Sequence, residues 1–360
     1  MKVSAVAKTK GKIHLSVSAR ILVNVEALNM AETVGNVSRH RRAPVIVESG
    51  ASYSLVYVPA VSGESLAYSY QTLLAQVADS VGLPVTEMDR RGFFLKFSDN
   101  NVINAVYKEV SDVVGLNDPC EVEKKLLKAS CVADVAGFLY TDKLVKRTSR
   151  VRFGYMVPAV DALSKGAATT YPQLHVRYAP LELLKAQPRA QPIYYVESGS
   201  SLYTFTASLA VSDIGELEYC QDVDKDLKEQ KLKRVEAAAK ALIGLVDGLM
   251  LGAKRSRYKP VWEVRSLMAS VSKGPIPFEV SPGSHAGYIL ETSKRAEVIQ
   301  KLTGVRIELY AFDREGVAKS GTNLGNVKFF DTHSEALAEA IRMALELVSK
   351  ELEETGKGAG

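Results

Sequence analysis

Residues 13 to 26 carry the feature that most constrains the fold, because apolar side chains recur there at every second position. A period of two is that of a β-strand, in which successive side chains point to opposite faces. The intervening positions are mostly polar, and Arg20 is among them. The pattern therefore predicts a long, half-buried strand with one polar face.

Other periodic segments add strands and helices to this element. Further strands are expected at residues 203–211, 260–267 and 304–312, and helices at residues 66–81, 119–132, 224–250 and 332–354. Strands and helices do not alternate strictly along the chain, so a doubly wound nucleotide fold is not indicated. We expect an α+β protein with an antiparallel or mixed sheet.

The composition bounds the class of protein and its surroundings. With 360 residues and 46% apolar side chains, the chain can bury the core of one elaborated domain or of two ordinary ones. Cys120, Cys131 and Cys220 contain no CxxC pair, which argues against a disulfide framework and a cysteine zinc site and favours a reducing compartment. No apolar run approaches the ~18 residues of a membrane span. We therefore expect a soluble, cytoplasmic protein without a membrane partner.

A basic segment at residues 36–44 is the clearest sign of a ligand. Its residue types predict a loop that is neither helix nor strand, and a helix is expected to start soon after it, near Glu64. The free N–H groups and the dipole of a helix N-terminus favour negative charge. The two features suggest a polyanion held between loop and helix. The net charge of +5 is mild, so any nucleic-acid affinity has to come from such local clusters.

Two further basic clusters lie later in the chain, each near serine, threonine or glycine. They consist of Lys143, Lys146, Arg147, Arg150 and Arg152, and of Lys254, Arg255, Arg257 and Lys259. Aromatic side chains follow both clusters, at Phe153, Tyr155, Tyr258 and Trp262. Such interleaving is expected of single-strand binding by charge and stacking. The alternative, that the basic residues are solvated surface and the aromatic residues are core, stays open.

Catalytic signals are weak. The chain has no GxGxxG, GxxxxGK[ST], HExxH or GxSxG motif, so no cofactor, metal site or catalytic residue is indicated. His40 is the one histidine set among arginines, where it could act as general base on a ribose 2′-hydroxyl. A structural or phosphate-contacting role for His40 is the alternative.

Several blocks of sequence, which follow one another in a fixed order, indicate a family resemblance that residue spacing alone does not show. They are residues 21–29, 34–36, 40–44, 58–67, 70–71, 132–140, 147–159, 175–177, 201–205, 252–257 and 260. Together they resemble the archaeal type I-A CRISPR Cascade backbone subunit, of the DevR-like CRISPR-associated autoregulator family. The resemblance covers roughly residues 15 to 270, and the C-terminal quarter is more divergent.

The resemblance implies a modified RNA-recognition-motif (ferredoxin-like) palm with an antiparallel sheet, helical insertions and a protruding thumb-like hairpin. It implies no catalysis. Copies of such a chain polymerise into a helical filament along a CRISPR guide RNA, which they present for pairing with a target DNA strand. The implied partners are therefore the guide RNA, the target strand, other copies of the chain and other Cascade subunits.

The resemblance also implies domain bounds and guide contacts. We expect a palm at residues 1–61 and 196–330, a helical insertion at 62–154, a thumb at 155–195, a C-terminal helix at 331–355 and a disordered end at 356–360. Met156 is expected to wedge between bases, since an apolar side chain on a projecting loop can unstack them. The expected RNA-binding residues are Arg20, Asn36, Arg39, His40, Arg41, Ser62, Gly63, Arg147, Arg150, Met156, His175, Lys254, Arg255 and Arg257.

Two rival functions stay open. A metal-independent endoribonuclease that processes CRISPR transcripts would also be a basic, sheet-based RNA binder, with His40 as its base. A DNA-binding regulator would need a recognition helix with exposed base-reading residues, and no helix here ends in that pattern. The aromatic pattern of ordinary RNA-recognition motifs is not readable either, so we expect sequence-independent binding.

Overall fold

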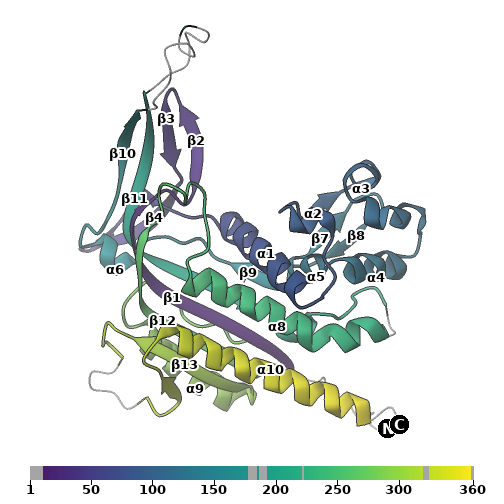
Figure 1. The fold of residues 1–360 in the computed structure, drawn as a ribbon. Helices are drawn as coiled ribbons and strands as arrows, with labels where there is room; N and C mark the ends of the chain where they lie inside the picture. Colours follow the sequence, from purple (N-terminus) through teal and green to yellow (C-terminus); the bar gives the residue numbers. More distant parts are fainter. Residues whose placement is uncertain (1–10, 177–184, 186–192, 221–222, 319–323, 358–360) are drawn as a thin grey trace.

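The computed structural model describes residues 11–176, 185, 193–220, 223–318 and 324–357 (Figure 1). A nine-stranded sheet organises the chain, and strand β1 (Lys12–Glu26) lies inside it between β11 (Ile193–Leu209) and β12 (Val261–Gly274), antiparallel to both. The strands that complete this sheet are β2 (Met30–Val34), β3 (Val37–His40), β9 (Val151–Phe153), β10 (Ala168–Val176), β13 (Arg306–Asp313) and β14 (Val327–Phe329). The sheet is mixed, because β3 and β14 join it in parallel. The expected α+β class is confirmed.

The apolar face of β1 forms the centre of the core. Its alternating side chains, from Ile13 to Val23, are at most 1% exposed. Helices α1 (Gly63–Ser80), α8 (Lys225–Asp247) and α10 (His333–Lys357) cover this face, and α8 and α10 pack side by side (Figure 1). The long strand and these three helices are therefore confirmed.

The polar face of β1 is also buried, which the sequence did not predict. Residues 278–283 and helix α9 (Tyr288–Thr303) lie over it. Ser16 and Ser18 accept hydrogen bonds from the backbone N–H groups of Val280 and Gly283, at 3.1 and 3.0 Å. The small polar side chains of this face thus satisfy the backbone of the covering segment, so their polarity does not signal exposure to solvent.

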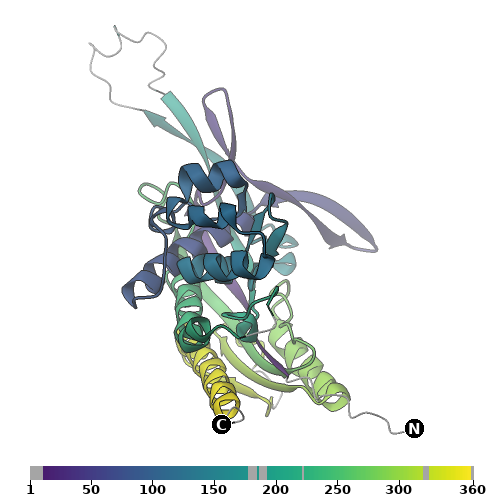
Figure 2. The same ribbon diagram turned by 90° about the vertical axis from the view of Figure 1, so that its right-hand side faces the viewer.

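Two β-hairpins and strand β10 project from the body of the molecule (Figures 1 and 2). One hairpin is β2–β3, and the other pairs β4 (Arg42–Ser49) with β5 (Ser52–Pro59) in a separate two-stranded sheet. The expected loop at residues 36–44 is therefore wrong, because only Arg41 lies between β3 and β4. Gly35, in the two-residue turn of β2–β3, has a φ of +60° that favours glycine and lets the chain form a tight hairpin.

The segment expected to be a thumb, residues 155–195, begins inside the body of the molecule and continues into the projecting strand β10 (Figure 1). Met156 is fully buried in the main core, and its backbone pairs with Val61 in an isolated bridge. Helix α6 (Val160–Leu163) and strand β10 follow it. Residues 177–184 and 186–192 lie outside the described part of the chain. A buried Met156 cannot wedge between bases, so that prediction is wrong.

Residues 84–147 form a smaller helical unit with its own core. Its elements are α2 (Glu87–Arg90), β6 (Phe97–Ser98), α3 (Asn100–Val106), a 3-10 helix (Lys108–Gly115), α4 (Pro119–Ala129), α5 (Cys131–Ala136), β7 (Phe138–Tyr140) and β8 (Val145–Arg147). The helix expected at residues 119–132 is two helices. Ser130 leaves the helical conformation and caps α5, accepting a hydrogen bond from the N–H of Ala133 at 2.9 Å.

A disulfide joins Cys120, in the first turn of α4, to Cys220. This corrects the argument against a disulfide that the cysteine spacing suggested. The two cysteines are 100 residues apart in the sequence, so no short spacing announces the pair. Cys131 is free and buried. In the described part of the chain, no helix is long and apolar enough to cross a lipid bilayer.

At its C-terminal end, α10 continues to Lys357, two residues into the segment expected to be disordered. Residues 358–360 lie outside the described part. The division into palm, insertion and thumb stays a prediction.

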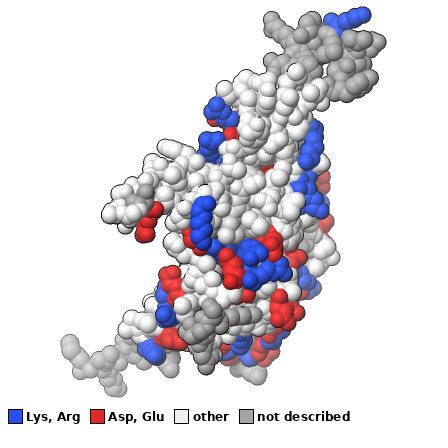
Figure 3. Space-filling view, turned by 90° about the vertical axis from the view of Figure 1, so that its left-hand side faces the viewer, with Lys and Arg blue, Asp and Glu red and all other residues white. Residues whose placement is uncertain are grey.

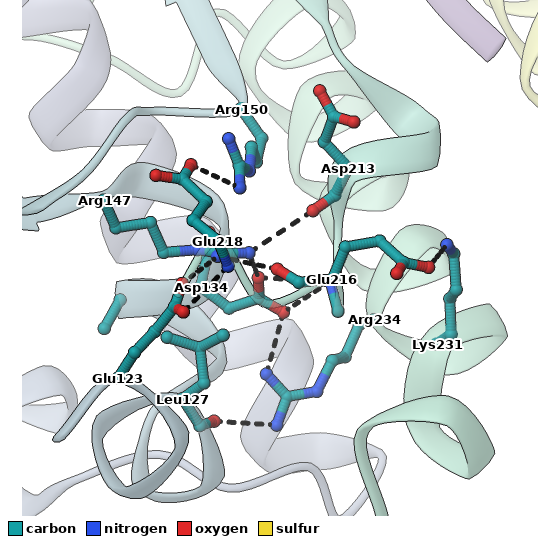
Figure 4. Close-up of polar contacts among 12 residues, drawn as sticks. Glu123, Leu127, Asp134, Arg147, Arg150, Asp213, Glu216, Glu218, Lys231 and Arg234 are labelled. Atoms are coloured by element: carbon teal, nitrogen blue, oxygen red, sulfur yellow. Dashed lines mark hydrogen bonds and ion pairs between the residues drawn. The ribbon is translucent and has the colours of Figure 1, made fainter. Parts of the chain in front are cut away.

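Buried ion pairs connect the helical unit to the main body (Figure 4). Arg147 forms ion pairs with Asp134 and with Glu123, the latter at 2.9 Å, and Arg234 of α8 pairs with Asp134 at 2.9 Å. All four side chains are fully buried. Burial alone would raise the pKa of Asp134, but the charges of Arg147 and Arg234 outweigh it and hold that pKa below its ordinary value. Asp134 is therefore ionised at neutral pH.

Replacing Arg147 tests how much this network contributes. In Arg147→Met, Glu123 and Asp134 would lose a cationic partner inside the protein, and we expect the free energy of unfolding to fall by about 3–5 kcal/mol. The matched control is Arg152→Met, because Arg152 is an exposed arginine on the next strand; we expect it to change stability by less than about 0.5 kcal/mol. Urea denaturation of both variants measures the difference, and equal midpoints would contradict a stabilising role.

Candidate nucleic-acid interface

Residues 26–30, which we call the hub, connect the basic elements of the chain. At the end of β1 a bulge shifts the register between Val23 and Glu26, and Val25 takes a φ of 53°. The bulge reverses the alternation, so Val25 is 53% exposed and Glu26 is fully buried. Glu26 then accepts hydrogen bonds from the N–H of Leu28 at 2.7 Å and the hydroxyl of Tyr203 at 2.6 Å.

His40, at the end of β3, is held by the same carboxylate. Its Nε2 donates to Glu26 at 2.8 Å and its Nδ1 donates to the carbonyl of Arg41 at 2.8 Å. Both partners are acceptors, so both ring nitrogens carry protons. Burial would lower the pKa of His40, but the carboxylate of Glu26 outweighs it and raises that pKa above its ordinary value. His40 is therefore a buried imidazolium.

Asn29 and Leu28 fix three further segments. The carbonyl of Asn29 accepts from the N–H of Arg41 at 2.7 Å, and its side-chain oxygen accepts from the N–H of Ser62 at 2.9 Å. The carbonyl of Leu28 accepts from the N–H of Ala253 at 2.9 Å. Gly252 approaches so closely that an added Cβ would lie 2.7 Å from the side chain of Leu28. The hub thus brings the first basic segment, the start of α1 and the third basic cluster together.

The first basic segment borders a cavity of about 400 Å³. Arg39 is 54% exposed in its side chain and lies 3.6 Å from Glu32, a loose surface pair. Arg42 is half exposed and donates to Glu197 at 2.8 Å. Nε of Arg41 is buried and has no hydrogen-bond partner among the described residues. The cavity therefore presents three guanidinium groups, one of which has an unused buried donor.

The third basic cluster is anchored by aromatic side chains. Arg257 donates to the hydroxyl of Tyr194 at 2.7 Å, and Tyr258 is hydrogen-bonded to Nε2 of His175. The His175 ring stacks on Tyr194, with ring centroids 5.2 Å apart. Lys254 is exposed, with a φ of 52° in the left-handed region. His175 therefore fixes the loop that carries the cationic side chains.

The start of α1 lies beside these elements but is covered. Ser62 is 2% exposed, and its hydroxyl accepts from the N–H of Ser65 at 3.3 Å as the helix cap. A Cβ on Gly63 would lie 2.9 Å from the carbonyl oxygen of Phe153. Asn36 lies in the β2–β3 turn, and its carbonyl accepts from the N–H of Tyr195 at 2.8 Å. Ser62 and Gly63 therefore position the basic segment and do not form an open anion site themselves.

Three arginines expected to bind RNA lie buried in ion pairs, away from the hub. Arg20 is 2% exposed and binds Asp161 at 3.0 Å and Glu315 at 2.7 Å. Arg147 belongs to the network of Figure 4, as does Arg150, whose partner Glu218 lies at 2.7 Å. Their positive charges are neutralised within the fold. We therefore leave Arg20, Arg147 and Arg150 out of the interface.

Reasoning from sequence missed the residues that hold the interface together. Glu26 and Asn29 gave no signal, since the alternation of β1 placed Glu26 on an exposed face and only the bulge turns it inward. Tyr194 was also missed. Arg42 and Lys259 stood in the basic clusters but were not among the expected RNA-binding residues; both are exposed.

A family model and curated relatives agree on the family to which the chain is similar. A family model described as CRISPR-associated negative auto-regulator DevR/Csa2 matches residues 17–293. The CRISPR-associated protein Cas7/Csa2 1 and the CRISPR-associated aCascade subunit Cas7/Csa2 2, both from Saccharolobus solfataricus, are each 35% identical to the chain, covering 84% of it and 93% of each relative. A solved chain titled CRISPR RNA-guided surveillance complex is 12% identical and has a TM-score of 0.46, with 92% of this chain and 99% of that chain covered.

The His40–Glu26 pair predicts a specific pH dependence of stability. Because the folded pKa of His40 is raised, the pair stabilises fully below the ordinary histidine pKa of 6.5 and loses this contribution as the pH rises through the folded value. We expect the stability difference between the wild type and Glu26→Gln to be largest at acid pH and to shrink as the pH rises. Urea midpoints from about pH 5 to about pH 9 measure it. A constant difference would contradict an ionised pair.

Proposed function

Because the chain belongs to the CRISPR-associated DevR/Csa2 family, we propose that it binds a CRISPR guide RNA and polymerises along it as the backbone subunit of a Cascade complex. One relative is named an aCascade subunit, and we extend that role to this chain. The observation that carries the proposal is the convergence of two separate basic segments on the hub, residues 26–30.

The chemistry of the interface supports a polyanion as ligand. Arg39 is paired only loosely with Glu32, so it can turn to a phosphate at little cost. The unused Nε of Arg41 would gain a partner from a phosphate oxygen, which relieves the cost of a buried, unsatisfied donor. Lys254 and Lys259 extend the positive charge along the neighbouring loop. These groups would bind the phosphates of an RNA backbone, and such contacts do not depend on the base sequence.

We propose binding that does not depend on RNA sequence, since one subunit has to accept any guide. The interface offers guanidinium and ammonium groups, whose contacts with phosphates position a strand without reading it. The guide bases would then stay free to pair with a target DNA strand. The finer parts of this proposal are a type I-A complex, an RNA-recognition-motif palm, other Cascade subunits as partners and a cytoplasmic location.

We also propose that the chain is not a catalyst. The nuclease alternative depends on His40 as general base, but both ring nitrogens of His40 donate to acceptors inside the protein. A protonated, fully buried imidazole cannot take a proton from a 2′-hydroxyl. Incubation of repeat RNA with the chain in a metal chelator tests this point: we expect intact RNA, and cleavage abolished by His40→Ala would contradict it.

Neutralising single cations should reduce both RNA affinity and its dependence on salt. Each phosphate contact with single-stranded RNA contributes a slope of about 0.7 to a plot of log affinity against log salt concentration. We expect Arg39→Gln and Lys254→Gln each to lower the slope for poly(U) by about 0.7 and to weaken binding at low salt. Fluorescence anisotropy across a salt series measures both quantities.

The matched control is Arg342→Gln, because Arg342 is an exposed arginine on α10 whose ion pairs lie within that helix. It should leave the slope and the affinity unchanged. A salt response that is flat in the wild type, or equal losses in all three variants, would overturn the proposed phosphate contacts.

A further inference from the structure

The β4–β5 hairpin, which we call the arm, exposes an unusually apolar face. Cross-strand partners lie on the same side of a hairpin, and here they are Pro44 with Tyr57, Ile46 with Leu55, and Glu48 with Tyr53. The large apolar side chains of this face are between 59% and 74% exposed; they are Ile46, Tyr53, Leu55 and Tyr57. Nothing in the described part of the chain covers this face.

A hairpin with such an apolar face is expected to dock on another surface. An isolated two-stranded hairpin is marginally stable in water, and a contiguous exposed apolar surface marks an interaction site. Residues 43–59 contain a single charged side chain, Glu48, and it is acidic. Figure 3 shows the arm as a largely uncharged projection with acidic atoms near its tip. A surface without cations does not attract the RNA backbone, so the arm fits another protein surface.

A matching surface lies on the three-stranded sheet of the helical unit. Phe97 of β6 is next to Leu139 of β7, and Leu139 is next to Lys146 of β8, so the three side chains form a row across one face. Phe97 is 66% exposed and Leu139 is 39% exposed. Lys146 is exposed too, and no carboxylate of the described residues forms an ion pair with it. The row is apolar with a cation at its end, complementary to an apolar arm that ends in Glu48.

Figure 1 places strand β4 of the arm and strands β7 and β8, which carry Leu139 and Lys146 of this row, on opposite sides of the molecule. Two complementary surfaces on opposite sides join copies head to tail, and such a contact continues as an open chain unless its rotation closes a ring. We propose that the arm of one copy docks on the Phe97–Leu139–Lys146 row of a second copy. The inference deepens the proposed function, on which it rests, by naming the surfaces through which copies polymerise.

Two charged substitutions separate docking from RNA binding. Leu55→Glu, on the arm, and Leu139→Glu, on the row, each place a charge in the docked interface. We expect both to lose cooperative binding to poly(U), with apparent affinity weakened about tenfold or more, while an oligo(U) shortened until it holds one copy is bound as by the wild type. The matched control is Val298→Glu, since Val298 is 61% exposed on α9, outside both surfaces. It should keep cooperative binding.

The two variants also complement each other if the contact is head to tail. Leu139→Glu retains a working arm and Leu55→Glu retains a working row, so each alone should sediment as a monomer at high protein concentration without RNA, and their mixture should form a dimer and no larger species. A mixture that stays monomeric, while the wild type associates, would overturn the pairing of these two surfaces. Reversing both charges, Glu48→Lys with Lys146→Glu, should restore association that either reversal alone weakens.

The outcomes distinguish the docking proposal from the function on which it rests. If Leu55→Glu loses affinity for the short oligo(U), the arm contacts RNA and the docking proposal is wrong. If the wild type binds neither RNA, the proposed function fails, and sedimentation of the mixed variants still decides the docking. Variants that sediment as the wild type does would overturn the docking proposal alone.

Discussion

The interface depends on one change of direction in the backbone, the bulge that turns Glu26 into the protein at the end of β1. A buried carboxylate needs several donors, and Glu26 finds them in His40, Tyr203 and the N–H of Leu28. These bonds fix the backbone of the hub. Its carbonyl groups and the side-chain oxygen of Asn29 are then placed to accept hydrogen bonds from the neighbouring strand, helix and loop. The basic residues around the hub therefore take their positions because the buried carboxylate of Glu26 has to be hydrogen-bonded.

The arginines of this chain serve two separate purposes. Those with two carboxylate partners, such as Arg20 and Arg147, connect distant segments inside the fold. Those near the hub, such as Arg39, are exposed and weakly paired. Desolvation explains the separation, because a buried guanidinium has to be neutralised, whereas an exposed one stays available to a ligand. A count of basic residues along the sequence cannot make this distinction.

The sequence predicted those features that depend on local periodicity. The apolar alternation of β1 and the apolar periodicity of residues 224–250 located a central strand and helix α8 correctly. The sequence did not predict features that depend on contacts between segments far apart in the chain. Residues 278–283 bury the polar face of β1, and Cys120 meets Cys220 from 100 residues away. Residues 36–44 resembled a loop by composition, yet pairing with β2 and β5 makes most of them strand.

The central claim is that the chain assembles on a guide RNA, and its most direct test is to identify what the chain carries from a cell. The chain would be purified from a host that expresses a CRISPR array, the co-purifying nucleic acid extracted and sized, and the particles imaged by negative stain. The account predicts intact RNA of guide length inside helical or arc-shaped particles. A monomer without RNA, or one that cuts added repeat transcript, would contradict it.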